Sequence, residues 1–159
     1  MEQLEIEKKE IYFELDGSNF RQEVENLEAQ LINSGGDNVF VGNSEYIPQT
    51  HSFAEGIYIR EIFIPKGTFV IGKIHKLHHS FFLIQGKLRM FSENGVKDLE
   101  APIYGVAESG TKRVAYAFED CKFINVFPNP NNIKEIDVLE DIYVSSSYID
   151  YENFKLLNK

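Results

Sequence analysis

Residues 67–86 read GTFVIGKIHKLHHSFFLIQG, and this stretch indicates more about the fold than about the activity. Two strand-like apolar runs, TFVIG and SFFLIQ, flank three of the four histidines. The wider window 62–92 contains no Asp or Glu, although it holds Lys66, Lys73, Lys76, Lys87 and Arg89. In a chain of net charge −9 this is a local reversal of sign. Such a segment either forms a site for an anion or carries lysines that simply point into solvent.

The length and composition predict one globular domain, covering residues 1–159. The single cysteine, Cys121, excludes an internal disulfide and is typical of a reducing compartment. The first ten residues, MEQLEIEKKE, do not resemble a secretory signal, and no apolar run approaches membrane-spanning length. We therefore expect a cytoplasmic protein without a membrane partner. A pI of about 4.9 argues against binding to a nucleic-acid polymer.

Residues 2–34 predict a strand followed by a helix. Apolar residues two apart between Glu2 and Leu15 indicate an edge strand or an arm. Ser18 then offers an N-cap, and Phe20, Val24, Leu27 and Leu31 follow at helical spacing. Gly35 and Gly36 are expected to end this helix.

Residues 38–128 predict a barrel or sandwich of short strands. β-branched and aromatic runs alternate with turn residues every eight to twelve positions. Tight turns are expected at 65–67, at Asn94-Gly95 and at Glu119-Asp120, the last two as hairpins. Pro128 and Pro130 end the strands, because proline cannot donate to a ladder.

The C-terminal arm, residues 131–159, is expected to begin with a short helix. Ile133, Ile136, Leu139 and Ile142 fall three apart among acidic neighbours. The tail YVSSSYIDYENF is rich in aromatics, so we expect it to pack on the barrel or on a partner subunit.

A metal site is the first chemical hypothesis for the histidines. His75 and His79 are four residues apart, which on a flat strand separates them by roughly 13 Å. Both reach one ion only if the chain turns or bulges around Lys76 and Leu77. The surrounding window also lacks the carboxylate that commonly completes such a site.

The order Gly67, His75, His79 and Gly86, followed by Glu108-Ser109-Gly110-Thr111-Lys112-Arg113, resembles the two conserved motifs of the cupin superfamily. Residues 50–130 are also similar to uncharacterised cupin-domain proteins of tailed bacteriophages and prophages. The resemblance implies a jelly-roll β-barrel with an added N-terminal helix and a short C-terminal helical arm. It does not imply one activity, because a fold hosts many functions.

The functional hypothesis depends on the positions at which this chain differs from the cupin motifs. The first motif usually has two closely spaced histidines and a glutamate, whereas 80–85 supplies no acid. At the position of the second motif's histidine stands Arg113, and Ala117 replaces the motif's Asn. A guanidinium cannot ligate a cation, but it binds phosphate or carboxylate through paired hydrogen bonds. We therefore expect an anion in place of a metal, and no cofactor.

Strand alternation places Arg113, Ala115 and Ala117 on one face, where the small alanines leave room inside a barrel. Lys73 and His75 are expected to share a face as well. The remaining residues that we predict to contact the ligand lie elsewhere in the barrel: His51, Arg60 and Tyr116. In the scheme, Arg60, Lys73 and Arg113 bind the anion, while His51, His75 and His79 donate hydrogen bonds. Each also has a structural interpretation, as a hydrogen-bonded histidine, a surface ion pair or a core aromatic residue.

Three functions follow from these observations. The first is a phage protein without enzymatic activity that binds a small anion and sequesters a nucleotide signal of bacterial immunity. The second is a metal-dependent cupin isomerase or dioxygenase with His51, His75 and His79 as ligands. The third is a virion component or assembly factor. A homodimer or higher homo-oligomer is expected from the resemblance and from the aromatic tail.

Overall fold

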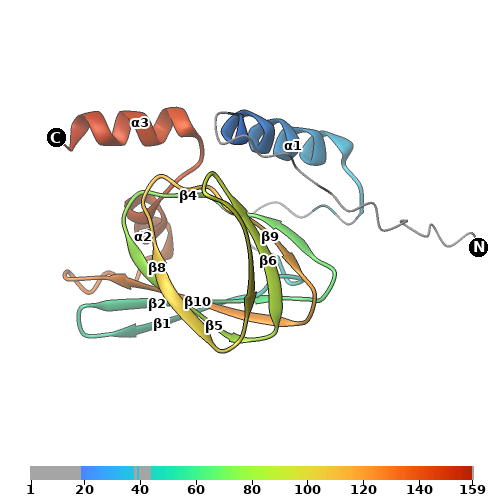
Figure 1. Cartoon of the computed structure of the whole chain (residues 1–159). Coiled ribbons are helices and arrows are strands. Elements are labelled where there is room, and N and C mark those ends of the chain that lie inside the picture. The colour runs from blue at the N-terminus through green and yellow to red at the C-terminus, as the bar shows by residue number, and fades with distance from the viewer. Residues whose placement is uncertain (1–18, 38, 40–43, 159) are drawn as a thin grey trace, which may run out of the picture.

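The computed structural model describes residues 19–37, 39 and 44–158. Two sheets face each other and form a barrel, with helices α1 and α3 side by side along one side of it (Figure 1). The elements in chain order are α1 Phe20–Ser34, β1 Gln49–Ala54, β2 Ile57–Ile64, β3 Phe69–Ile71, β4 Ile74–His75, β5 His79–Gln85, β6 Lys87–Ser92, β7 Gly95–Glu100, β8 Ile103–Ala107, β9 Val114–Ala117, β10 Cys121–Pro128, α2 Ile136–Tyr143, β11 Val144–Ser145 and α3 Tyr148–Leu157. The predicted mainly β fold with helices at both ends is confirmed.

All strand pairs are antiparallel. The larger sheet has the order β1-β2-β10-β5-β8, the second has the order β3-β9-β6-β7, and the short strands β4 and β11 pair with each other. The Asn94-Gly95 hairpin is confirmed, since β6 and β7 pair around it and Gly95 adopts φ +100°.

The predicted hairpin at Glu119-Asp120 is wrong. β9 pairs with β3 and β6, whereas β10 pairs with β2 and β5, so this turn carries the chain from one sheet to the other. Turn residues indicate that the chain reverses, but not whether the two strands remain in one sheet. Packing of the two sheets decides the latter.

Helix α1 covers the outer face of the smaller sheet. Its buried Phe20 and Val24 pack against Phe91 and Val114. The helix ends at Gly35 in the left-handed conformation, as expected. Its N-cap is Asn19, whose side chain forms no capping hydrogen bond. The predicted Ser18 cap and the strand within residues 2–15 lie outside the described residues.

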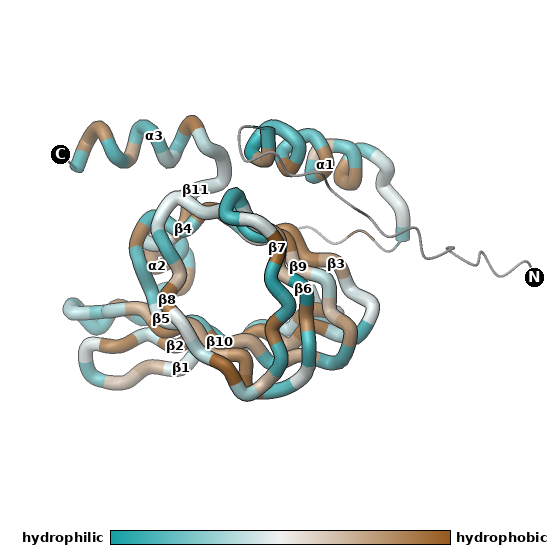
Figure 2. The backbone as a smooth tube through the Cα atoms, in the orientation of Figure 1, coloured by the Kyte–Doolittle hydropathy of each residue, from teal (hydrophilic) through white to brown (hydrophobic). Residues whose placement is uncertain are grey.

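The C-terminal arm packs on the barrel. Leu139 and Tyr143 of α2 lie against Tyr58 and Phe127 of the larger sheet, and Tyr148 and Tyr151 of α3 pack on Ile74. Figure 2 shows α3 alternating between hydrophilic and hydrophobic residues along its length, and of these Ile149, Leu156 and Leu157 are exposed.

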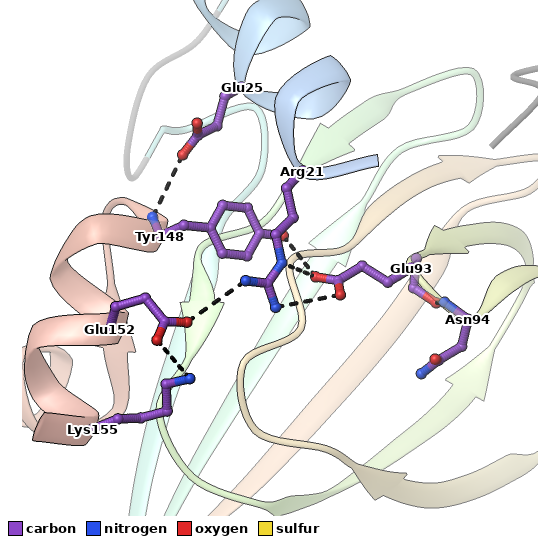
Figure 3. Close-up of polar contacts among 8 residues, drawn as sticks. Arg21, Glu25, Glu93, Asn94, Tyr148, Glu152 and Lys155 are labelled. Carbon is purple, nitrogen blue, oxygen red and sulfur yellow. Dashed lines mark hydrogen bonds and ion pairs between the residues drawn. The ribbon is translucent and has the colours of Figure 1, made fainter. Parts of the chain in front are cut away.

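A charged network joins α1 and α3 to the β6–β7 turn (Figure 3). Arg21 Nε lies 2.8 Å from Glu93 Oε1, and its guanidinium lies 4.4 Å from the centre of the Tyr148 ring. Tyr148 donates to Glu93 at 3.3 Å, and Glu152 lies 3.7 Å from Arg21. The burial of Tyr148 and the neighbouring Glu93 raise the Tyr148 pKa, so its hydroxyl stays protonated and donates. This network holds the turn against the helices.

The barrel interior has two chemically different ends. One end is the apolar core, defined by Ile64, Leu83, Leu88, Leu99, Ala115, Ala117, Cys121 and Phe123. Toward the other end lies the polar cluster, defined by Arg60, His75, His79, Arg113 and Asn125, of which Arg60, His79 and Asn125 lie on strands β2, β5 and β10 that also supply the apolar core. Ala115 and Ala117 lie in the apolar core, which confirms the predicted inward face of β9.

Candidate functional site

The register of the larger sheet aligns polar side chains across it. His51 of β1 stands opposite Arg60, which stands opposite Asn125 of β10, which in turn stands opposite Phe81 of β5. Directly opposite residues of antiparallel strands share a face. Phe81 stands opposite Gly105, where an added Cβ would lie 2.9 Å from the Phe81 ring. A side chain at 105 would therefore displace that ring.

A bend brings His75 and His79 together. β4 ends at His75, the chain bends at Lys76 and Leu77, and β5 begins at His79. The two imidazole centres lie 4.2 Å apart. The bend that would bring the two histidines together is thus present, and the separation of roughly 13 Å expected for His75 and His79 on a flat strand does not apply.

His79 is a buried, neutral imidazole. Its Nε2 lies 3.0 Å from Asn125 Oδ1, and its Nδ1 lies 3.4 Å from the carbonyl oxygen of Leu77. Burial lowers the His79 pKa to about 4, and both Arg113 and Arg60 add to this effect. The side chain therefore carries no charge at neutral pH.

His75 is neutral for the same reason, and one of its nitrogens is unsatisfied. Burial is the main reason that the His75 pKa lies well below the usual range, and the neighbouring His79, Arg60 and Arg113 lower it further. Its Nδ1 is buried and has no hydrogen-bond partner among the described residues. An unpaired buried polar atom is costly and needs an explanation. A ligand that hydrogen-bonds to His75 is one such explanation.

Two guanidinium groups flank the imidazoles. Arg60 lies over the Phe127 ring at 5.4 Å, and Arg113 lies over the Phe81 ring at 5.9 Å. Burial lowers the pKa of each arginine, although both remain charged. Neither forms a hydrogen bond or an ion pair with a carboxylate of the described residues, and Arg60 Nε is buried without a partner. The nearest compensating charges are Glu140 for Arg60 and Glu108 for Arg113.

A cavity of ≈ 160 Å³ lies beside Arg113 within the barrel. Phe81, Met90 and Leu99 supply apolar lining, while Lys97 and Glu108 are the other charged groups on its wall. A shallower depression of ≈ 390 Å³ reaches His79 and Phe127 from the outside, and its lining contains neither Lys nor Arg. Of the two, the first is the one whose lining includes a guanidinium, that of Arg113.

The cluster does not fit a divalent cation. Only two imidazoles converge, and the groups that face them are the guanidinium of Arg113 and that of Arg60, which repel a cation and cannot ligate it. His51 is not the third ligand, because the rings of Tyr58 and Phe127 separate it from His79. Within 19–37, 39 and 44–158, no group of three His, Cys, Asp or Glu side chains is arranged to hold a metal.

The structure places three of the predicted ligand contacts outside the cluster. Lys73 is exposed and forms an ion pair with Glu140 at 3.0 Å, so it does not share the inward face of His75. Tyr116 stands opposite Arg89 on the outer face of the smaller sheet. His51 lies at the margin, where its Nδ1 is 2.8 Å from the Tyr58 hydroxyl, and burial and Arg60 lower its pKa. The structure brings together Arg60, His75, His79 and Arg113.

The sequence argument missed Asn125 and Phe81. Asn125 is 3% exposed and is the one polar residue on the inward face of β10, between Phe123 and Phe127. A polar residue at a position where strand alternation predicts an apolar, inward side chain indicates a buried hydrogen bond. Phe81 gives no such signal, because phenylalanine on a strand is usually core.

Comparisons with known proteins support the fold. No protein-family model matches the chain, and no curated protein is significantly similar in sequence. Among solved structures, ectoine synthase from P. lautus has a TM-score of 0.51 at 14% identity, over 65% of this chain and 78% of that one. The fold is a cupin-like jelly-roll barrel. The cupin-like barrel also matches KdgF from Halomonas sp., with a TM-score of 0.47 at 19% identity over 61% of this chain and 91% of that one.

An RmlC-like cupin from Methanocaldococcus jannaschii gives a TM-score of 0.45 at 15% identity, over 58% of this chain and 90% of that one. The match to ectoine synthase, at 14% identity, supports a shared fold alone. None of the described helices has the length and apolarity needed to cross a bilayer.

Proposed function

We propose that this cupin-like barrel binds a small anion beside Arg113 without transforming it. The observation that carries the proposal is the presence of two inward guanidinium groups with no hydrogen-bonded carboxylate among the described residues. Burying a charge without a partner is expensive, so a bound anion is the natural counter-ion. Arg113 contacts the anion, Arg60 adds positive potential, and His75 offers an unsatisfied nitrogen.

The two histidines support binding rather than proton transfer. A general base works best with a pKa near the operating pH, whereas burial holds the pKa of His79 at about 4. A neutral imidazole instead offers one N–H donor and one acceptor to a ligand.

The resemblance to phage proteins supports a more specific role, the sequestration of a nucleotide signal of host immunity in the host cytoplasm. Sequestration needs affinity and no catalysis, which agrees with the low pKa of His79, about 4. The cavity volume of ≈ 160 Å³ favours anions smaller than a nucleotide, since pockets for drug-sized ligands span about 300–1,000 Å³. Phage origin, cytoplasmic location and the homodimer remain predictions.

Calorimetry at pH 7 tests the proposal. Inorganic phosphate, acetate and a panel of linear and cyclic nucleotides are titrated into the wild type, Arg113→Gln and Arg89→Gln. Arg89 is the matched control, because it lies outward on β6 and is paired with Asp98 at 2.7 Å. We expect at least one anion to bind to the wild type and to Arg89→Gln, and about tenfold weaker binding to Arg113→Gln. If none of these anions binds, the proposal is wrong.

The metal-dependent enzyme is the rival, and elemental analysis separates the two. A stoichiometric transition metal in the purified protein, lost in His75→Ala, would overturn the anion proposal. Detection of the chain in purified virions would instead favour the role of a particle component.

A further inference from the structure

The cavity beside Arg113 is amphipathic. Phe81, Met90 and Leu99 reach it from β5, β6 and β7, so apolar side chains line it from both sheets. The guanidinium of Arg113 is the half-buried charge on its wall, while Lys97 and Glu108 are exposed. A ligand in this space therefore meets the apolar side chains of Phe81, Met90 and Leu99 and, elsewhere on the wall, polar groups that include the guanidinium of Arg113.

The volume limits the apolar part of the ligand. A cavity of about 150 Å³ lined by Leu, Ile and Phe accepts benzene, and this cavity measures ≈ 160 Å³. The Phe81 ring forms part of the wall and lies close against Gly105. An aromatic or compact aliphatic group of six or so carbons is therefore the body that fits.

The charge of the site favours a carboxylate over a phosphate. Of the two clustered arginines, Arg113 is the one that lines the cavity, and Glu108 already offsets part of its charge. A monoanionic, planar carboxylate matches one guanidinium through two parallel hydrogen bonds. Arg113 and Lys97 together with Glu108 leave one net positive charge on the cavity wall, which a monoanion balances and a doubly charged phosphate exceeds.

We infer that the barrel binds a small carboxylate that carries an apolar group of about the size of a benzene ring, with the carboxylate at Arg113 and the apolar group among Phe81, Met90 and Leu99. This inference rests on the proposed function, since it names the chemical class of the anion. The site is preorganised, because the turn that bears Ser92 and Asn94 on the cavity wall is held by the ion pair of Glu93 with Arg21 (Figure 3).

Calorimetry with four probes at pH 7 tests the inference: benzoate, acetate, inorganic phosphate and benzyl alcohol. We expect benzoate to bind at least about tenfold more tightly than acetate, because its ring buries apolar surface that acetate lacks. Benzyl alcohol, which keeps the ring without the charge, is expected to bind at least about tenfold more weakly than benzoate.

Two substitutions separate the parts of the site. Arg113→Gln is expected to weaken the binding of benzoate about tenfold or more. Met90→Phe, which fills the cavity, is expected to weaken the binding of benzoate while the affinity for acetate stays within about twofold of the wild type. Arg89→Gln, on the outward face of the same strand as Met90, should behave as the wild type. Thermal unfolding of each variant shows whether it folds, and Arg113→Lys, which keeps the charge but not the paired geometry, should give an intermediate affinity.

The outcomes distinguish the inference from the proposed function. Binding of phosphate or acetate with no gain for benzoate would overturn the inference and leave the proposed function standing. Benzyl alcohol that binds as tightly as benzoate would also overturn it, because the guanidinium would then play no part. Failure of all three anions would overturn the inference, and failure of the nucleotide panel as well would remove the proposed function.

Discussion

The two ends of the barrel interior share strands β2, β5 and β10, yet their energetics are opposite. β2 supplies Arg60 and, two residues later, Ile62, and β5 supplies His79 and, four residues later, Leu83. At the apolar core these side chains exclude water and stabilise both sheets. In the polar cluster the same geometry partly buries two guanidinium groups and leaves unpaired buried atoms on Arg60 and His75, which costs stability.

This difference between the apolar core and the polar cluster indicates where the functional site lies. Selection for folding alone favours apolar residues at all inward positions, since replacing buried charges by well-packed apolar groups is often neutral or stabilising. A protein that keeps buried arginines retains a cost that a ligand can offset. We therefore infer that the apolar core stabilises the fold and that the polar cluster is the functional site.

The largest expected effect comes from breaking the apolar core. Leu83 is fully buried, so Leu83→Ala removes its contacts and leaves a cavity. We expect the free energy of unfolding to fall by about 2–5 kcal/mol, measured by urea denaturation. Ile84→Ala is the matched control, because Ile84 is 49% exposed on the other face of the same strand. An equal loss in both variants would contradict the assignment of the core.

Acidification is expected to have the second-largest effect on stability, because it protonates the histidines of the polar cluster. The His79 pKa falls from 6.5 in the unfolded chain to about 4 in the folded one, so the unfolded state binds more protons between these values. Stability should therefore decrease as the pH falls below 6.5, by about 3 kcal/mol at pH 4 from this group, and His75 adds to it in the same direction.

Urea midpoints measured between pH 7 and 4 check this dependence. His79→Gln should flatten the profile, and the double variant with His75→Gln should flatten it further. His78→Gln is the control, because His78 is exposed and should keep the wild-type slope. A wild-type slope in the double variant would show that other groups cause the loss.

A smaller effect of opposite sign is expected at Arg60. Arg60→Met removes a buried charge and an unpaired Nε but keeps much of the volume next to Phe127. We expect the free energy of unfolding to stay unchanged or to rise by about 1 kcal/mol, while the affinity for the best anion found at Arg113 decreases. A loss of more than about 2 kcal/mol would show that Arg60 is structural.

The smallest effect is expected at Lys73. Its ion pair with Glu140 joins side chains that are 49% and 35% exposed, so solvent screens it. Lys73→Ala should change the free energy of unfolding by less than about 0.5 kcal/mol and should leave anion affinity unchanged. Loss of binding in this variant would restore Lys73 to the site.

Local patterns in the sequence account for much of the fold. Helical spacing from Phe20 to Leu31 predicted α1, and the Asn-Gly pair predicted the β6–β7 hairpin. The alternation after Arg113 placed the two alanines on the inward face of β9. Each of these inferences depends on residues that are close in sequence, for which a single periodicity decides the outcome.

The candidate site was predictable only in part. Arg113 was found because it stands at a motif position, but Asn125 was overlooked although it faces the same interior. Lys73 was predicted to face inward from strand alternation, whereas the chain leaves the strand between β3 and β4 at that point. A short irregular segment breaks the two-residue period, so alternation no longer gives the direction of the side chain.

The sequence by itself determined that this chain forms a barrel of short strands with helices at both ends, and that its basic, histidine-bearing segment lacks an acid. Only the tertiary structure decided that β9 and β10 lie in different sheets, that His75 and His79 meet at 4.2 Å, and that a cavity opens beside Arg113. The physical reason is that hydrogen-bonding periods are local, whereas sheet pairing, bends and voids depend on how residues distant in sequence pack together.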